Sequence, residues 1–181
     1  MTARDGRGGY GADPDVMPLG GYAALVGLFT AAVGGFLGWA SRRRRLPHRV
    51  SAADIVLLGV ATQKLTRLVG RDFVTAPLRA PFTRYQGSLL PGEVKERSRG
   101  HGLRRAVGDL LTCEYCLAPW ISAGLFATHA LNPPLARFIA AMTAAVSLSD
   151  AGNHLYLALA RAELRLDATS GQRPPALATS A

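Results

Sequence analysis

The feature that most constrains this chain is an uncharged run of 23 residues, Leu19 to Ser41. At 1.5 Å per residue, a helix of that length crosses a hydrocarbon core of roughly 30 Å. The run ends at four consecutive arginines, Arg42, Arg43, Arg44 and Arg45. A cleaved signal peptide carries its positive charges before the apolar run, so we interpret the segment as a membrane anchor. The arginines then face the cytoplasm, where they meet lipid or a partner, and the N-terminus lies outside.

The balance of charge points to a membrane rather than to nucleic acid. Lys and Arg outnumber Asp and Glu by 21 to 12, which gives a formal net charge of +9, and 49% of the residues are hydrophobic. Basic residues that flank long apolar runs are typical of membrane topology. The basic stretches also lack the interleaved aromatic residues that support nucleic-acid binding, so we expect no nucleic-acid partner.

The stretch after the anchor differs from a membrane span. Ser51 followed by Asp54 is typical of a helix start, and apolar residues recur at helical spacing up to residue 70. The uncharged run over residues 55–63 is too short to cross a bilayer. We therefore predict an amphipathic helix over residues 51–70 that lies along the cytoplasmic interface or is partly inserted. An alternative topology lets this helix cross fully.

A basic loop over residues 71–105 favours the interfacial topology. Its eight basic and three acidic residues leave a charge of +5, and the positive-inside rule keeps such a loop in the cytoplasm. Anionic lipid headgroups are a candidate partner of this loop. Pro77, Pro81 and the dipeptide Pro91-Gly92 predict irregular backbone through it.

Residues 106–160 predict a helical hairpin. Two apolar stretches, 106–131 and 138–160, flank Asn132-Pro133-Pro134, which predicts a turn because the residue before a proline is pushed out of the helical region. The predicted fold class is therefore an all-α membrane protein with three transmembrane helices and one interfacial or partly inserted helix. It comprises an anchor (19–41) and a membrane domain (51–165), with disordered tails at 1–18 and 166–181.

The predicted helical hairpin also contains the polar residues that are candidates for a metal site or a redox pair. Residues equidistant from the turn lie at similar depth in antiparallel helices, so Cys113 and Cys116 should lie beside Asp150 and His154. Two thiolates, an imidazole and a carboxylate make a tetrahedral set for zinc or iron. The alternatives are a thiol–disulfide redox pair and a polar cluster that only packs the helices. Pro119 predicts a kink beside the cysteines.

A resemblance to a known family is carried by two stretches, ATQKLTRLVGRDFVTAPLRAPFTRYQG and GLRRAVGDLLTCEYCLAPWISAG. Over about residues 51–160 the chain resembles the bacterial membrane-protein family of domain of unknown function 1360. The resemblance rests on an Arg-x4-Asp-x6-Arg element, matched by Arg67, Asp72 and Arg79. It also rests on a Leu-Thr-Cys-x-x-Cys-x-x-x-Trp element that ends at Trp120, in which Glu114 stands where the family pattern has proline. The resemblance implies a small multi-helix protein of the bacterial inner membrane that has no assigned activity.

The function predicted from the sequence is that of a non-enzymatic integral membrane protein with a structural or partner-binding role. A metal site at Cys113 and Cys116 is the first alternative, and thiol–disulfide chemistry is the second. Gly34 and Gly38 have the G-x-x-x-G spacing of packed membrane helices, which makes a second copy of the chain a candidate partner. We expect a multi-pass topology with the N-terminus outside and the C-terminus in the cytoplasm.

Overall fold

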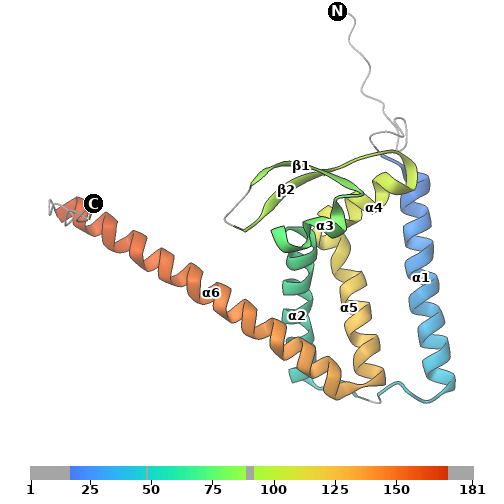
Figure 1. The fold of residues 1–181 in the computed structure, drawn as a ribbon. Coiled ribbons are helices and arrows are strands. Elements are labelled where there is room, and N and C mark those ends of the chain that lie inside the picture. The colour runs from blue at the N-terminus through green and yellow to red at the C-terminus, as the bar shows by residue number, and fades with distance from the viewer. Residues whose placement is uncertain (1–16, 48, 89–91, 171–181) are drawn as a thin grey trace, which may run out of the picture.

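Three helices stand side by side, and a smaller unit of helices and strands covers one of their ends (Figure 1). The computed structural model describes residues 17–47, 49–88 and 92–170, so most of both predicted tails lies outside the described residues. The upright helices are α1 (Leu19–Arg42), α2 (Ala52–Gly70) and α5 (Glu114–Leu131), and α6 (Pro133–Ser170) runs obliquely from them. The unit at the end, here called the cap, consists of η1 (Phe73–Thr75), α3 (Ala76–Arg79), β1 (Thr83–Ser88), β2 (Val94–Ser98) and α4 (Gly102–Thr112).

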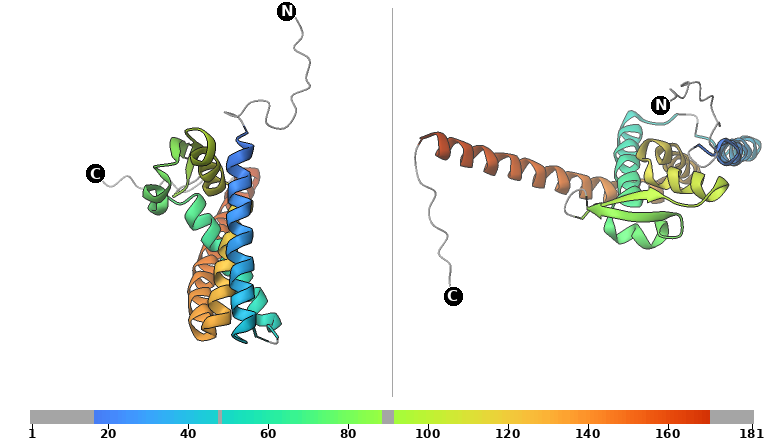
Figure 2. Two further views of the ribbon diagram at one scale, coloured as in Figure 1. Left: turned by 90° about the vertical axis from the view of Figure 1, so that its right-hand side faces the viewer. Right: turned by 90° about the horizontal axis from the view of Figure 1, so that it is seen from above.

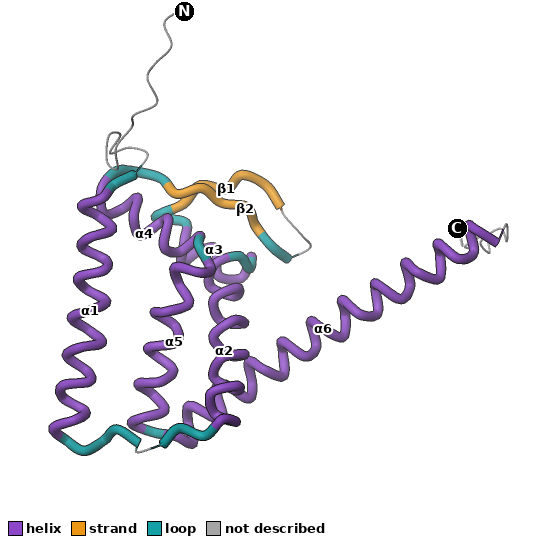
Figure 3. The backbone as a smooth tube through the Cα atoms, turned by 180° about the vertical axis from the view of Figure 1, so that it is seen from behind, coloured by secondary structure: helices purple, strands orange, loops and turns teal. Residues whose placement is uncertain are grey.

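Helix α2 stands within the helical layer between α5 and α6, and it is not the interfacial helix that the sequence predicted (Figure 3). The predicted helix start is confirmed, because the Oγ of Ser51 accepts a hydrogen bond from the N–H of Asp54 at 3.0 Å. Leu58 and Ala61 of α2 form the apolar core with one residue each from α5 and α6. Burial of this face between two helices stabilises the upright position of α2.

Part of the basic loop folds into an antiparallel β-hairpin, so the all-α prediction was wrong. Strands β1 and β2 pair from Thr83 opposite Ser98, and a bulge follows Tyr85. Gly87 and Gly92 have φ values of 135° and 86°, a region that glycine enters without the steric cost of a Cβ atom. Gly87 therefore permits the bulge, and Gly92, which was expected in irregular backbone, permits the entry into β2.

The described residues contain fewer candidate membrane spans than the three predicted. Of the described helices, α1 is long and apolar enough to cross a membrane by itself. Helices α4 and α5 are long and apolar enough only when taken together, as one span broken by a bend of 84°. The break is at Cys113, whose extended backbone (φ −106°, ψ 105°) ends α4 and begins α5. Helix α5 continues through Pro119. The prediction of three spans was wrong because residues 106–131 form two helices and α6 does not qualify as a span.

Helix α6 leaves the layer instead of returning along α5. Its first half packs mainly against α2, and its second half runs away from the other helices, as the view from above shows (Figure 2). The helix continues to Ser170, beyond the predicted end of the membrane domain at residue 165. Residues at equal distances from the turn therefore do not meet, which is why the predicted common depth of the cysteines and Asp150 does not bring them together.

The cap contacts α1 near the start of that helix. A Cβ atom on Gly21 would lie 2.8 Å from the Cβ of Ala106 in α4, so the two helices pack backbone against backbone. Next to this contact, the Tyr22 hydroxyl donates to one carboxylate oxygen of Asp109 at 2.8 Å, and the hydroxyl of Ser98 donates to the other. Asp109 thus joins α1, α4 and β2.

This packing gives a matched pair of variants in the first turn of α1. Gly21→Ala should lower the free energy of unfolding by about 1–3 kcal/mol, because the added methyl group overpacks the contact with α4. Gly20→Ala should be neutral or stabilising, because nothing lies within 4 Å of its Cβ position and alanine favours a helix over glycine. Denaturation of both variants in detergent micelles measures the difference, and equal stabilities would contradict the contact.

Candidate functional site

The candidate site lies at the break between α4 and α5, here called the elbow (residues 112–116). The sulfur atoms of Cys113 and Cys116 are at disulfide distance, and their Cα atoms are 5.2 Å apart. Cys113 is the N-cap residue of α5, and its Sγ accepts a hydrogen bond from the backbone N–H of Cys116 at 3.2 Å. Cys116 is exposed, whereas Cys113 is half-buried. The pair is therefore a disulfide at the start of a long helix and not two free thiolates.

Glu114, between the two cysteines, has a structural partner. Its carboxylate forms an ion pair with Arg71 at the end of α2. The backbone of α2 also approaches closely, since a Cβ atom on Gly70 would lie 3.3 Å from the carbonyl oxygen of Leu111. Glu114 therefore attaches the elbow to α2.

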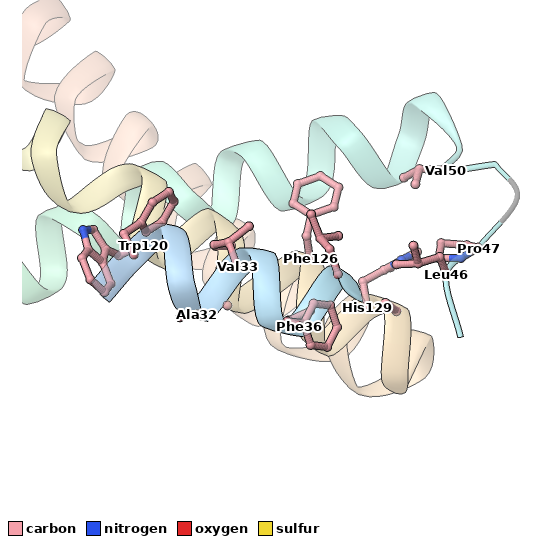
Figure 4. Close-up of a pocket in the computed structure, with 15 residues that line it drawn as sticks. Ala32, Val33, Phe36, Leu46, Pro47, Val50, Trp120, Phe126 and His129 are labelled. Carbon is pink, nitrogen blue, oxygen red and sulfur yellow. The ribbon is translucent and has the colours of Figure 1, made fainter. Parts of the chain in front are cut away.

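Two apolar cavities open along the seam between α1 and α5. Trp120 of α5 meets Phe29 of α1 edge to face, with ring centroids 5.1 Å apart, and both residues line both cavities. The cavity toward the Arg42 end has a volume of about 540 Å³ and is drawn in Figure 4. The other cavity, about 630 Å³, adjoins the elbow and is lined by Cys113 and Cys116. We call it the elbow cavity.

The structure does not bring the other predicted metal ligands to the cysteines. The carboxylate of Asp150 pairs with Lys64 of α2 at 2.6 Å, and His154 is exposed on the second half of α6. Within residues 17–47, 49–88 and 92–170, no group of three or more His, Cys, Asp or Glu side chains could hold a metal ion. The divergence of α6 from α5 is the physical reason that the predicted zinc or iron set is not assembled.

Arg79, from the first family element, has no exposed side-chain surface. Its guanidinium donates to both carboxylate oxygens of Glu96 in β2 at 2.8 and 3.4 Å. It also donates to the carbonyl oxygens of Val69 and Asp72, at 2.5 and 3.0 Å, and to the hydroxyl of Thr75 at 2.6 Å. One side chain therefore connects the end of α2, η1 and the hairpin.

Arg67 and Asp72, the other two residues of that element, lie beside this centre. Arg67 forms an ion pair with Glu93 just before β2, and this hydrogen bond raises the pKa of Arg67 above its ordinary value in spite of partial burial. The backbone of Asp72 forms an isolated antiparallel bridge with Glu93. The three residues of the element thus hold the cap on α2.

The two basic stretches lie at opposite ends of the helical layer. Arg42, Arg43, Arg44 and Arg45 are exposed where α1 ends, whereas residues 71–105 belong to the cap end (Figure 1). Several basic side chains of the loop bond within the chain: Arg71, Arg79, Arg99, Arg104 and Arg105. Part of the positive charge of this loop is thus bound within the chain. The contact of this loop with anionic headgroups stays a prediction.

A polar cluster at the Arg42 end was not predicted. Asp54, at the start of α2, accepts two hydrogen bonds from the guanidinium of Arg137 in α6, at 2.8 and 2.9 Å, and one from the Ser51 hydroxyl at 2.7 Å. His129 of α5 is buried with its Nε2 3.5 Å from the same carboxylate. No local pattern signalled this cluster, because Asp54 and Arg137 are 83 residues apart in the sequence.

The bonds from Arg137, followed by the bond from Ser51, hold the pKa of Asp54 well below its usual range. The positive charge on Arg137 and the nearby His129 act in the same direction, whereas burial opposes them. The cluster therefore joins the ends of α2, α5 and α6 through a carboxylate that stays charged.

Comparison with known proteins identifies the group to which this fold belongs. The family model described as "Protein of unknown function (DUF1360)" matches residues 57–156. The chain belongs to this family. The sporulation protein YjcA of Bacillus subtilis (strain 168) is 29% identical over 103 residues, which cover 55% of this chain and 87% of that relative. No solved structure matches. The DUF1360 match confirms the family recognised from the sequence, and it includes the cap and the elbow but not α1.

The Asp54 cluster predicts a component of acid sensitivity. Because the pKa of Asp54 is lower in the folded chain than in the unfolded chain, its stabilisation is complete above about pH 4, the ordinary range of aspartate, and is lost as the pH falls. Arg137→Met removes the main cause of the lowered pKa of Asp54, so the stability of this variant should fall less steeply with acid than that of the wild type. Arg84→Met, at an exposed arginine of β1, should keep the wild-type slope.

Thermal denaturation of the three proteins in micelles, from neutral pH down to about pH 2, measures these slopes. A slope for Arg137→Met as steep as that of the wild type would contradict the assignment to Asp54.

Proposed function

We propose that this chain is a membrane-anchored binding protein that is held in the bilayer by α1. The exposure of α1 carries the proposal, because only 6% of its most apolar stretch is buried. Leu28, Leu37 and Trp39 of this helix are all exposed. Contact with water costs about 25 cal/mol for each Å² of apolar surface, and the hydrocarbon core of a bilayer removes this cost.

The arginines after α1 supply the orientation in this proposal. Four consecutive arginines next to a span favour the cytoplasmic side, so Arg42–Arg45 lie inside. The other end of α1 contacts the cap through Tyr22 and Asp109, so in this proposal the cap and the elbow lie outside, which reverses the cytoplasmic position that the charge of residues 71–105 predicted. An outward elbow agrees with the disulfide between Cys113 and Cys116, since disulfides persist in oxidising compartments and are rare in the cytosol.

The partner that we propose for α1 is a second copy of the chain. Gly34 and Gly38 lie one helical turn apart and are exposed, and nothing lies within 4 Å of the Cβ position of either. Two glycines at this spacing let membrane helices approach closely enough for van der Waals packing of their backbones. Gly35 is equally open, but it lies about 100° around the helix from Gly34 and serves as a matched control.

The test uses the full-length chain expressed with two different tags. We expect both copies to stay in the membrane pellet after an alkaline wash, and each tag to co-purify the other from detergent. Gly34→Leu with Gly38→Leu should remain in the pellet but lose most of the co-purification, because the added side chains separate the helices. Gly35→Leu should retain both properties.

The outcomes separate the two parts of the proposal. Recovery of the wild-type chain in the alkaline wash would contradict anchoring by α1. Retention in the pellet without co-purification, or equal co-purification by the Gly34/Gly38 and Gly35 variants, would contradict the partner surface.

A further inference from the structure

We propose that Cys113 and Cys116 form a redox-active disulfide that accepts two electrons from a protein dithiol docked at the elbow cavity. The inference goes beyond the binding role of α1 and does not depend on it. It rests on the unequal positions of the two sulfur atoms, on the contacts that hold the elbow without the disulfide, and on the cavity beside it.

The two sulfur atoms differ in the way that thiol–disulfide exchange requires. Cys116 is exposed and Cys113 is half-buried, so Cys116 is the cysteine that an incoming thiolate reaches more easily. Cys113 is the N-cap residue of an 18-residue helix, and its Sγ already accepts the N–H of Cys116 at 3.2 Å. A sulfur that leaves with negative charge is stabilised at a helix N-terminus. Cys113 is therefore the leaving group and Cys116 the attacked atom.

The charge of Glu114 does not oppose this step. A carboxylate beside the sulfurs would repel a developing thiolate, but that of Glu114 is paired with Arg71. The paired arginine compensates the negative charge next to the elbow.

The disulfide is not needed to hold the elbow. A disulfide that closes so short a loop removes little chain entropy from the unfolded state. The elbow is already held by the ion pair of Glu114 with Arg71 and by the bonds of Asp109 to Tyr22 and Ser98. Opening the disulfide therefore leaves these attachments in place.

The elbow cavity supplies a docking place for the partner. Its volume is about 630 Å³, and it is lined by both cysteines, by apolar residues of α1, α4 and α5 such as Val26, Phe29 and Trp120, and by the polar residues Tyr22, Asp109 and Thr112. A space of this kind accepts an apolar side chain next to the partner's cysteines. The occupant that we infer is a segment of a reduced protein that carries two cysteines and a flanking aromatic or aliphatic side chain.

The reaction balances as a two-step exchange. The first thiolate of the partner attacks the Sγ of Cys116, a mixed disulfide forms, and Cys113 leaves as a thiolate that takes up a proton. The second thiolate of the partner then attacks the partner's own sulfur in the mixed disulfide and releases Cys116 as a thiolate, which is also protonated. The partner dithiol is oxidised to a disulfide, and Cys113 and Cys116 are reduced to thiols.

The first experiment identifies the attacked sulfur. The full-length chain in micelles is equilibrated with mixtures of reduced and oxidised glutathione, quenched with acid, alkylated and mapped by peptide mass spectrometry. We expect reversible opening with an unchanged helical signal, and a glutathione adduct on Cys116 about tenfold more abundant than on Cys113. A disulfide that resists excess reduced glutathione, an adduct mainly on Cys113, or loss of the helical signal on reduction would each overturn the proposal.

The second experiment tests the cavity. The probe is a peptide with two cysteines and a neighbouring phenylalanine. Val26→Trp fills the cavity lining and should slow reduction by this peptide several-fold, while the rate with glutathione stays unchanged. Leu28→Trp is the matched control, because Leu28 is exposed on the same helix but lies outside the lining of both described cavities. Equal rates for the two variants, or a parallel loss with glutathione, would refute docking at the cavity.

Discussion

The buried guanidinium of Arg79 is the interaction on which the rest of the structure depends. Arg79 is fully buried, and its donors reach the last turn of α2, η1 and Glu96 of β2. Removing a charge from water is costly unless its partners are in place. Burial of Arg79 is therefore stable only when these segments are arranged around its guanidinium. The hairpin fixed in this way presents Ser98 to Asp109, which in turn holds α4 against α1. The position of the elbow thus follows from a chain of polar contacts that begins at Arg79.

The two ends of the helical layer differ in their residues, and the proposed orientation in the membrane rests on this difference. One end has exposed arginines, Arg42–Arg45, and the Asp54 cluster that joins α2, α5 and α6. The other end has the cap, the disulfide and the elbow cavity. Under the proposed orientation the arginines lie in the cytoplasm and the sulfur chemistry lies outside. The anchoring of α1 and the oxidation of Cys113 and Cys116 then agree with one topology.

Local signals in the sequence predicted the helices α1 and α2, but they did not predict the β-hairpin, the break at Cys113 or the long-range partners. The apolar run of α1 and the capping of α2 by Ser51 were visible because each depends on neighbouring residues. The hairpin was missed because proline and glycine were taken as irregular backbone, although they also permit a bulge and a turn. The pairing of Asp150 with Lys64 depends on the direction in which α6 leaves α5, which no local pattern specifies. The sequence identified the two cysteines as candidate site residues, but it did not predict their surroundings, because these depend on the break between α4 and α5 at Cys113.

A double-mutant cycle on Arg79 and Glu96 tests the central claim most directly. Arg79→Met and Glu96→Leu are made singly and together in the full-length chain, and the free energy of unfolding is measured by reversible denaturation in micelles. Each single variant should lose about 3–5 kcal/mol because it leaves a buried charge without its partner, and the double variant should lose clearly less than the sum. Single variants as stable as the wild type, or losses that simply add, would show that the cap does not depend on this pair.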